Sequence, residues 1–262
     1  MKTLVHGFEI VYDKSNQGSI PILLIHGFPL DRTLWVKQLG GINAHVIAPD
    51  LRGFGDSALP GGAVTIETYA EDLHALLDAL NIKNVVVAGL SMGGYITLAF
   101  YRKYPQRVRA LILANTKAGA DSAEAKKGRD DNAALVREKG AAAVGEKMMP
   151  KMLALKTVTE RPAIAATVQA MMARQSVNGV VAALMAIRDR PDSTPMLAQI
   201  SVPTLIITGA EDNLIPPKES KVMHDNIRSS QLVVIPNAAH LSNVEQPEAF
   251  NRAVNDFLKS LA

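Results

Sequence analysis

The chain has 262 residues, of which 48% are hydrophobic and 20% charged, and its 28 basic and 25 acidic side chains give a formal net charge of +3. This composition is typical of a folded globular protein with a sizeable core, and the scattered basic residues argue against nucleic acid as a partner. No apolar run reaches the ~20 residues of a membrane span and no signal peptide is recognisable, so we expect a cytoplasmic protein without a membrane partner.

Short β-rich apolar runs alternate along the chain with longer segments of helical periodicity. The predicted strands are residues 4–11, 20–25, 45–49, 84–88, 110–114, 203–208 and 231–235. The later runs lack polar alternation, which is typical of parallel strands that are buried on both faces. One clear helix is predicted from residue 66 to 80, with Thr65 as its N-cap and Asn81 at its end. The pattern predicts an α/β protein with a doubly wound, mostly parallel sheet.

No strand is predicted between residues 120 and 195, where Ala, Lys, Arg and Met are frequent. Helices are expected there, separated at Gly140, Pro150, Pro162 and the pair Asn178 and Gly179. We therefore predict a core in two parts, residues 1–119 and 196–262, with a helical cap or lid formed by residues 120–195. Six of the ten methionines lie in this segment, either as an adaptable pocket wall or as filling between helices: Met148, Met149, Met152, Met171, Met172 and Met185.

The stretch "VVVAGLSMGGYITLAF", residues 85–100, places Ser91 between a predicted strand and a predicted helix. Gly89 and Gly93 flank this serine in a GxSxG pattern, which at a strand-to-helix turn indicates a nucleophile elbow. Small neighbours let strand and helix approach closely, and the helix N-terminus offers N–H groups to a developing oxyanion. The alternative is a serine with only a structural role in the turn.

A nucleophilic serine needs a base and an acid that orients the base. His240, in "IPNAAHLSN", follows the last predicted strand, and Asp212, in "PTLIITGAEDNLIPP", follows the strand before it. Both therefore lie at the edge where the carboxyl ends of parallel strands gather. Asp212 is preferred to Glu211, which is one residue closer to the strand and should point elsewhere. The remaining candidates are expected to be surface or packing residues: His6, His45, His74 and His224.

The segment "LLIHGFPLDRTLW" follows another predicted strand. Gly27 permits a tight turn that directs the Phe28 N–H toward the space above Ser91, and the Met92 N–H would be its partner in an oxyanion hole. His26 is expected to hold this loop by hydrogen bonds rather than to transfer protons.

Other binding motifs are absent or incomplete. "GFGDSA" matches a dinucleotide fingerprint, but the Pro60-Gly61-Gly62 sequence prevents the helix that would receive a pyrophosphate. The chain contains no cysteine, no P-loop and no HExxH motif. We therefore predict no metal and no cofactor.

Taken together, "HGFP", "DLRGFGDS", "GLSMGG", "GAEDNLIPP" and "NAAHLSN" resemble motifs of the α/β-hydrolase superfamily over nearly the whole chain. Among its members the sequence is most similar to the esterase, 3-oxoadipate enol-lactonase and cofactor-free haloperoxidase group. The resemblance implies an α/β-hydrolase fold with an inserted helical cap and a structural ion pair between Asp50 and Arg52. The roles that it implies are nucleophile for Ser91, general base and acid for His240, orienting acid for Asp212, and oxyanion donors for Phe28 and Met92.

A serine at the elbow favours acyl transfer, so the expected function is hydrolysis of a small-molecule carboxylic ester or lactone through an acyl-enzyme. Leu214 and Leu241, next to the candidate acid and base, are expected to contact a moderately hydrophobic acyl or alcohol group. Perhydrolysis, enol-lactone hydrolysis, carbon–carbon bond hydrolysis and a lyase reaction at the same residues remain alternatives. A ligand receptor on a hydrolase fold is the non-enzymatic alternative.

Overall fold

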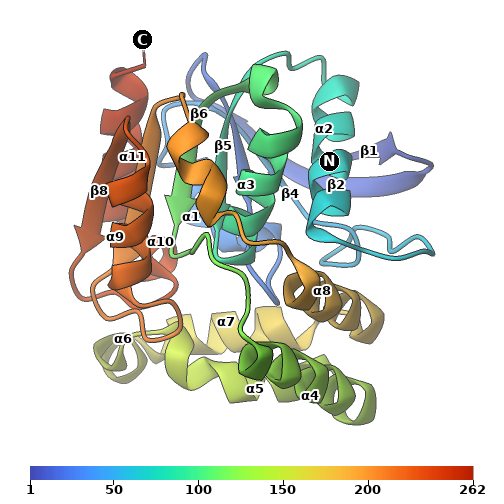
Figure 1. Cartoon of the computed structure of the whole chain (residues 1–262). Coiled ribbons are helices and arrows are strands. Elements are labelled where there is room, and N and C mark those ends of the chain that lie inside the picture. The colour runs from blue at the N-terminus through green and yellow to red at the C-terminus, as the bar shows by residue number, and fades with distance from the viewer. Residues whose placement is uncertain (262) are drawn as a thin grey trace.

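A computed structural model describes residues 1–261 and contains an eight-stranded sheet with helices on both faces (Figure 1). The strands are β1 Lys2–Val5, β2 Phe8–Asn16, β3 Pro21–Ile25, β4 His45–Pro49, β5 Val85–Leu90, β6 Val108–Ala114, β7 Thr204–Gly209 and β8 Ser230–Ile235. Their order is β1-β2-β4-β3-β5-β6-β7-β8, with antiparallel pairing of β2 to β1 and β4, and parallel pairing elsewhere. The prediction of a mostly parallel α/β sheet is confirmed.

The helices fall into those that cover the sheet and those that lie beyond its end. The covering helices are α1 Val36–Leu39, α2 Ile66–Ala79, α3 Met92–Lys103, α9 Pro217–Asn226, α10 Ser242–Glu245 and α11 Pro247–Lys259, with short 3-10 turns η1 Arg32–Trp35, η2 Pro105–Arg107 and η3 Thr194–Gln199. A second group lies together below the sheet in Figure 1: α4 Ala123–Lys139, α5 Ala141–Met152, α6 Leu155–Glu160, α7 Pro162–Ala173 and α8 Val177–Asp189.

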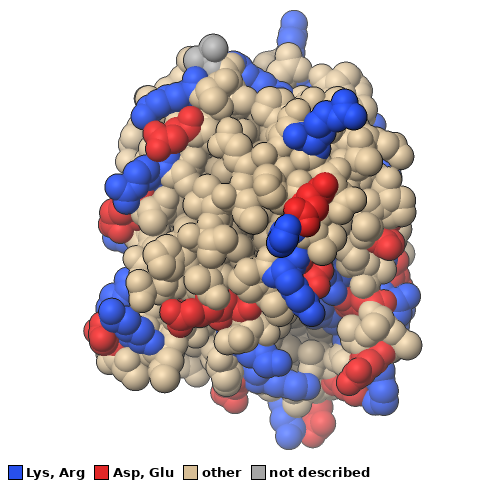
Figure 2. Space-filling model, turned by 60° about the vertical axis from the view of Figure 1, so that its left-hand side comes forward, with Lys and Arg blue, Asp and Glu red and all other residues tan. Residues whose placement is uncertain are grey.

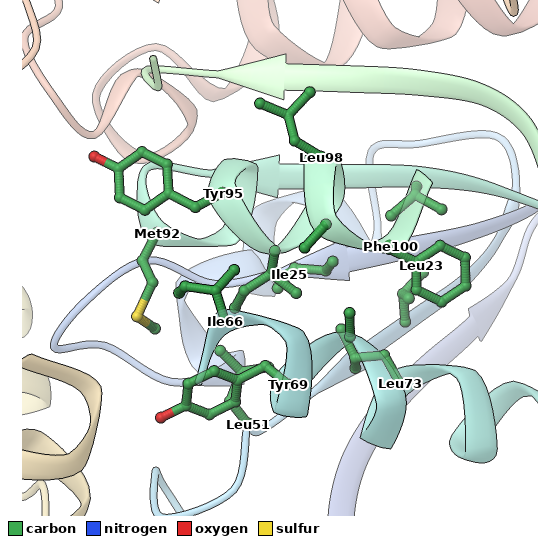
Figure 3. Packing of buried hydrophobic residues seen from close by; sticks show 14 of the residues in the cluster. Leu23, Ile25, Leu51, Ile66, Tyr69, Leu73, Met92, Tyr95, Leu98 and Phe100 are labelled. Carbon is green, nitrogen blue, oxygen red and sulfur yellow. The ribbon is translucent and has the colours of Figure 1, made fainter. Parts of the chain in front are cut away.

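Alternate residues of the parallel strands enter two hydrophobic cores. In β3, Leu23 and Ile25 pack with α2 and α3 on one face (Figure 3), whereas Ile22 and Leu24 pack with α11 on the other. On each face, every Å² of apolar surface that is removed from water stabilises the fold by about 25 cal/mol. Burial on both faces explains why the strand sequences are continuously apolar.

Helix α2 begins and ends as its sequence predicts. The Thr65 hydroxyl accepts from the Thr68 N–H at 3.0 Å, and the Thr68 hydroxyl accepts from the Thr65 N–H at 3.1 Å, which forms a capping box. Beyond the last turn, Asn81 has a φ of 56°, a left-handed conformation that ends the helix.

The single strand predicted at residues 4–11 is instead a hairpin. β1 and β2 pair with Val5 opposite Phe8, and the two residues between them, His6 and Gly7, have φ values of 48° and 82°. Two consecutive left-handed residues form a tight two-residue connection between strands. The buried residues Val5 and Phe8 are three positions apart, so the period-two pattern breaks at this turn, and the prediction of one continuous strand overlooks that break.

Two of the predicted helix breaks are also wrong. Gly140, with a φ of 85°, ends α4 and Pro162 starts α7 as predicted. Pro150, however, lies inside α5 near its end, and Gly179 lies in the first turn of α8. A Cβ on Gly179 would lie 1.9 Å from the Gly53 carbonyl oxygen, so glycine here permits close packing of α8 on the core.

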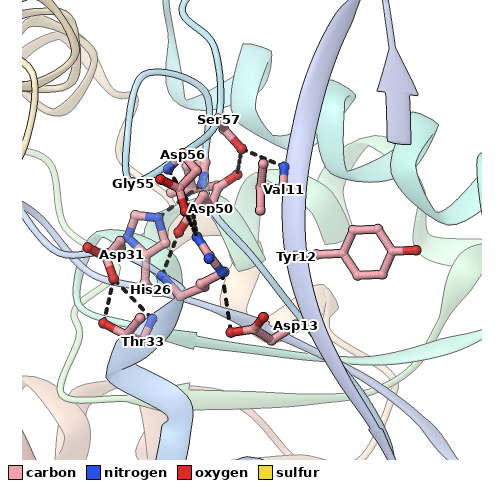
Figure 4. A network of polar contacts seen from close by, with 12 residues as sticks. Val11, Tyr12, Asp13, His26, Asp31, Thr33, Asp50, Gly55, Asp56 and Ser57 are labelled. Atoms are coloured by element: carbon pink, nitrogen blue, oxygen red, sulfur yellow. Dashed lines mark hydrogen bonds and ion pairs between the residues drawn. The ribbon is translucent and has the colours of Figure 1, made fainter. Parts of the chain in front are cut away.

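The ion pair expected between Asp50 and Arg52 is not formed. Asp50 pairs with the Arg32 guanidinium and accepts from the Arg32 N–H at 2.8 Å (Figure 4), whereas Arg52 donates to Asp72 at 2.6 Å. A Cβ on Gly55 would lie 2.2 Å from Asp50 Oδ2, so the "GFGDSA" loop wraps a buried carboxylate.

Positive and negative side chains are interspersed on the face shown in Figure 2, around a broad area without charged groups. Within residues 1–261, no single helix is both long enough and apolar enough to span a membrane. Helices α7 and α8 meet the length and composition criteria only when they are taken together, and they are bent by 93° relative to each other.

Candidate active site

Ser91 occupies a strained turn between β5 and α3. Its φ and ψ are 56° and −114°, a region that residues with a Cβ rarely adopt, at a cost of about 1–3 kcal/mol. The neighbouring strand compensates: the Ser91 N–H donates to the Ala114 carbonyl at 2.9 Å, and the Thr116 hydroxyl donates to the Ser91 carbonyl at 2.8 Å. The turn therefore holds the serine at the carboxyl end of the sheet.

The glycines around Ser91 are fixed by contact with backbone and neighbouring side chains. A Cβ on Gly89 would lie 2.0 Å from the Gly93 carbonyl oxygen, and one on Gly93 would lie 2.2 Å from the Ile25 carbonyl oxygen. On Gly94 it would lie 2.4 Å from the Thr116 hydroxyl. Close packing between β3, β5 and α3 therefore explains why this turn has the GxSxGG pattern.

Asp212 and His240 are brought together at the ends of β7 and β8. His240 Nδ1 lies 2.9 Å from Asp212 Oδ2, and both side chains are buried. Asp212 Oδ1 accepts from the Leu214 and Ile215 N–H groups at 2.9 Å each, and Asn115 Nδ2 donates to Oδ2 at 2.9 Å. Burial alone raises the pKa of the Asp212 carboxyl, but the His240 charge and these hydrogen bonds outweigh it and hold the pKa below its usual value.

The second ring nitrogen of His240, Nε2, is not engaged by Asp212. Because the Asp212 carboxylate accepts from Nδ1–H, the neutral imidazole carries its lone pair on Nε2. Among residues 1–261, Nε2 is buried without a hydrogen-bond partner. Ser91 and His240 are thus not hydrogen-bonded to each other in this structure, a contact that in hydrolytic enzymes often forms only in the substrate complex.

The two candidate oxyanion donors border the same cavity as Ser91. Met92 is the first residue of α3, whose N–H has no intrahelical acceptor, and Phe28 follows the turn at Gly27. A Cβ on Gly27 would lie 3.3 Å from Ser91 Cβ, so this loop passes directly over the serine. Within residues 1–261, the N–H groups of Phe28 and Met92 donate to no backbone carbonyl outside their own loop or helix.

His26 holds the loop that carries the candidate oxyanion donor Phe28. Its Nδ1 lies 2.9 Å from the Gly27 carbonyl oxygen and its Nε2 accepts from the Leu51 N–H at 3.0 Å. Burial lowers the pKa of His26, so the ring is neutral and both nitrogens are used in holding the loop.

Glu245 plays a similar part beside His240. One carboxylate oxygen accepts from the Ala239 N–H at 2.7 Å, and the other accepts from the Ala154 N–H and the Thr157 hydroxyl at 2.7 Å each. This fully buried side chain therefore ties the His240 loop to the segment between α5 and α6. No sequence motif predicts it.

A cavity of about 210 Å³ opens at Ser91. It is lined by Phe28, Ser91, Met92, Tyr95, Lys117, Asp121, Ala125, Arg129, Met148, Ile187, Leu214 and Ile215. Leu214 lies in its wall as expected, but Leu241 does not. Leu241 is wholly buried in the core, where its N–H donates to the Met152 carbonyl at 3.2 Å.

No sequence motif marks the polar part of this wall, where Tyr95, Lys117, Asp121 and Arg129 border the cavity. For the six methionines, either a pocket wall or filling between helices is expected, and only Met148 borders the cavity. Met152, Met171 and Met172 fill the core instead. Within residues 1–261, no cluster of three or more His, Asp or Glu residues is placed to hold a metal ion.

Comparison with known proteins identifies the family of the chain. The α/β hydrolase fold family model matches residues 20–247. The chain is 32% identical over 251 residues to 3-oxoadipate enol-lactonase 2 of Acinetobacter baylyi, which covers 95% of this chain and 92% of that protein. The malate-bound structure of a thermophilic esterase from Thermogutta terrifontis superposes with a TM-score of 0.94 at 39% identity and covers 99% and 97% of the two chains.

A third similar protein is the bromoperoxidase of Bacillus anthracis, with a TM-score of 0.87 at 25% identity over 99% of this chain and 100% of that one. The resemblance to the esterase, enol-lactonase and haloperoxidase group is thereby confirmed. Because a family model matches most of its length, the chain belongs to the α/β hydrolase fold family.

Proposed function

We propose that the protein is a serine hydrolase that cleaves small-molecule carboxylic esters or lactones through an acyl-enzyme. The observation that carries the proposal is the buried contact of His240 with Asp212, which leaves Nε2 without a partner at the same carboxyl edge of the parallel sheet as the strained Ser91 turn. Esterase and enol-lactonase relatives support the same chemistry.

In the acylation step, Ser91 Oγ attacks the ester carbonyl carbon while His240 Nε2 accepts the hydroxyl proton. The ionised Asp212 stabilises the imidazolium. The negative charge on the carbonyl oxygen is met by the N–H groups of Phe28 and Met92, each worth about 3 kcal/mol in such sites. When the tetrahedral intermediate collapses, the alkoxide leaves with the proton from His240.

In the deacylation step, His240 Nε2 accepts a proton from water as the water oxygen attacks the acyl-enzyme. Collapse of the second intermediate returns the proton to Ser91 Oγ and releases the carboxylic acid. A lactone differs only in that the leaving hydroxyl stays on the acyl chain. The helices between residues 120 and 195 act as a cap that shields these steps from bulk water.

Hydrolysis of short p-nitrophenyl esters tests the proposal. Ser91→Ala should lose at least about 10³-fold in kcat, because the nucleophile is removed. Ser229→Ala, at an exposed serine before β8, should retain activity. A fluorophosphonate should label the wild-type peptide that contains residue 91. Turnover of Ser91→Ala near the wild-type rate would overturn the proposal, and a stoichiometric burst without turnover would favour a ligand receptor.

The bromoperoxidase likeness favours perhydrolysis as a second reaction of the same acyl-enzyme, with hydrogen peroxide in place of water. Peracid formation from acetate and hydrogen peroxide, lost in Ser91→Ala, would establish it.

A further inference from the structure

Three cationic side chains surround a single carboxylate at the wall of the Ser91 cavity. Arg129 Nε and Arg190 Nη1 each lie 3.0 Å from Asp121, and Lys117 Nζ lies 3.6 Å from it. Lys117, Asp121 and Arg129 line the cavity, while Arg190 also stacks over the Tyr95 ring at 4.0 Å. The four groups leave a formal surplus of two positive charges.

This surplus of positive charge lies in a partly buried part of the cavity wall. The Asp121 and Arg190 side chains are 1% and 3% exposed, and those of Lys117 and Arg129 are 26% exposed. Like charges in a partly buried wall repel one another, and this repulsion favours the binding of an anion.

Two acidic residues on the adjoining helices do not supply it. Asp130 and Asp189 both pair with Arg188 and are 52% and 58% exposed. Asp121 is thus the one carboxylate that faces these cations among the described cavity-lining residues.

Several donors remain free to meet an anion. Arg129 reaches Asp121 through Nε alone, so its two terminal NH₂ groups are available. Lys117 Nζ is beyond hydrogen-bond distance from Asp121. Tyr95 lines the same cavity (its ring is labelled in Figure 3), and burial raises the pKa of its hydroxyl, which stays protonated.

We infer that Lys117, Arg129 and Tyr95 bind a free carboxylate of the substrate, so that the preferred esters or lactones carry a carboxylate besides the acyl group that reacts at Ser91. This inference rests on the proposed function. A carboxylate fits the surplus because its two oxygens accept from a guanidinium and an ammonium together. The proposed carboxylate site shares its cavity with Ser91. Lys117 directly follows Thr116, whose hydroxyl donates to the Ser91 carbonyl, so Lys117 is fixed close to the serine.

Matched substrates measure the preference. Monoethyl succinate and its neutral analogue diethyl succinate present the same acyl chain, so the ratio of their kcat/KM values isolates the carboxylate. We expect the wild type to prefer the monoester by at least about tenfold, a preference that weakens as salt rises. A wild-type ratio near one, with hydrolysis still dependent on Ser91, would overturn the inference and leave the proposed function intact.

Substitutions in the cavity wall test whether its cations cause the preference for the monoester. Arg129→Gln and Lys117→Met should each lower the monoester-to-diester ratio about tenfold or more. Arg188→Gln removes an arginine outside the cavity and should leave the ratio unchanged. A ratio unaffected by both cavity variants would contradict the inference.

Calorimetric titration with succinate separates this inference from the proposed function. The wild type should bind succinate, and Arg129→Gln should weaken binding about tenfold. Binding without hydrolysis of either ester would support the carboxylate site and reject the hydrolase proposal. Absence of binding together with absence of monoester preference would overturn the site.

Discussion

The Asn115 side-chain amide and the His240 imidazole both donate to the same oxygen of Asp212, Oδ2, at 2.9 Å each. Asn115 also donates to the Ala239 carbonyl at 3.1 Å and accepts from the Ser242 hydroxyl at 2.6 Å. It therefore joins the end of β6 to the candidate acid and to the loop of the candidate base.

Asn115→Gly should lower kcat by about 10- to 100-fold with little change in KM, because the carboxylate loses a partner that fixes its rotamer. Glycine accepts the φ of 46° at this position, so the variant tests the lost hydrogen bonds rather than backbone strain. Asn81→Gly is the matched control, since Asn81 is an exposed asparagine with a φ of 56°. Steady-state kinetics on one p-nitrophenyl ester decide, and equal activity of the two variants would reject the positioning role.

Asp212→Asn should reduce kcat by about 10⁴-fold, because an amide does not stabilise the imidazolium and permits the wrong tautomer. Glu211→Gln, at the exposed neighbouring position, should change kcat less than twofold. If Glu211→Gln is the severe variant in the same assay, the acid has been assigned to the wrong carboxylate.

Gly93→Ala should destabilise the fold by about 1–3 kcal/mol, because its Cβ would lie 2.2 Å from the Ile25 backbone carbonyl oxygen, which must shift to make room. The control is Gly128→Ala in α4, where nothing lies within 4 Å and alanine should stabilise the helix by up to about 1 kcal/mol. Urea unfolding followed by circular dichroism measures both. Similar midpoints for the two variants would contradict the packing argument.

Asp31→Asn should lower the free energy of unfolding at pH 7 by about 2–4 kcal/mol, because a buried carboxylate then loses charged hydrogen bonds. Asp31 accepts from Arg174 at 2.6 and 2.8 Å and from Gln175 at 2.8 Å, which ties the end of α7 to the loop after β3. Asp131→Asn, at an exposed i,i+4 pair with Lys127, should cost less than about 0.5 kcal/mol.

The same variant has a distinctive pH dependence. Burial alone raises the pKa of Asp31, but hydrogen bonds from Thr33 and Arg174 outweigh it and lower the pKa. The carboxylate therefore stabilises the fold above its unfolded pKa of about 4, and this contribution is lost as pH falls through the lower folded pKa. The difference in melting temperature between wild type and Asp31→Asn should thus shrink below about pH 4. A constant difference across that range would show that the charge is not involved.

Local chemistry explains which parts of the fold are predictable from sequence. The strand at His45–Pro49 and the turn at Ser91 are specified by residues within a few positions of each other, and both lie where expected. The hairpin at His6 is not predicted because its turn has only two residues, so the apolar residues on either side of it resemble one continuous strand.

Pairings across the chain are not specified locally. Asp50 has Arg52 two residues away, yet its partner is Arg32, because the loops meet only after the sheet has formed. Arg129 likewise reaches the cavity from a helix 38 positions after Ser91, a distance that no motif spans. The candidate catalytic residues are therefore predictable from sequence, whereas the residues that we propose to bind the substrate carboxylate are not.

The packed glycines around Ser91 also bear on how this protein acquires new specificities. At Gly89 and Gly93 even one added methyl group would collide with main chain, and at Gly94 it would collide with the Thr116 side chain. The cavity residues on the surrounding helices face open space and carry no such restriction. Mutational libraries aimed at new substrates should therefore spare residues 89–94 and randomise positions such as 125, 129 and 148, where side-chain changes leave the reaction machinery in place.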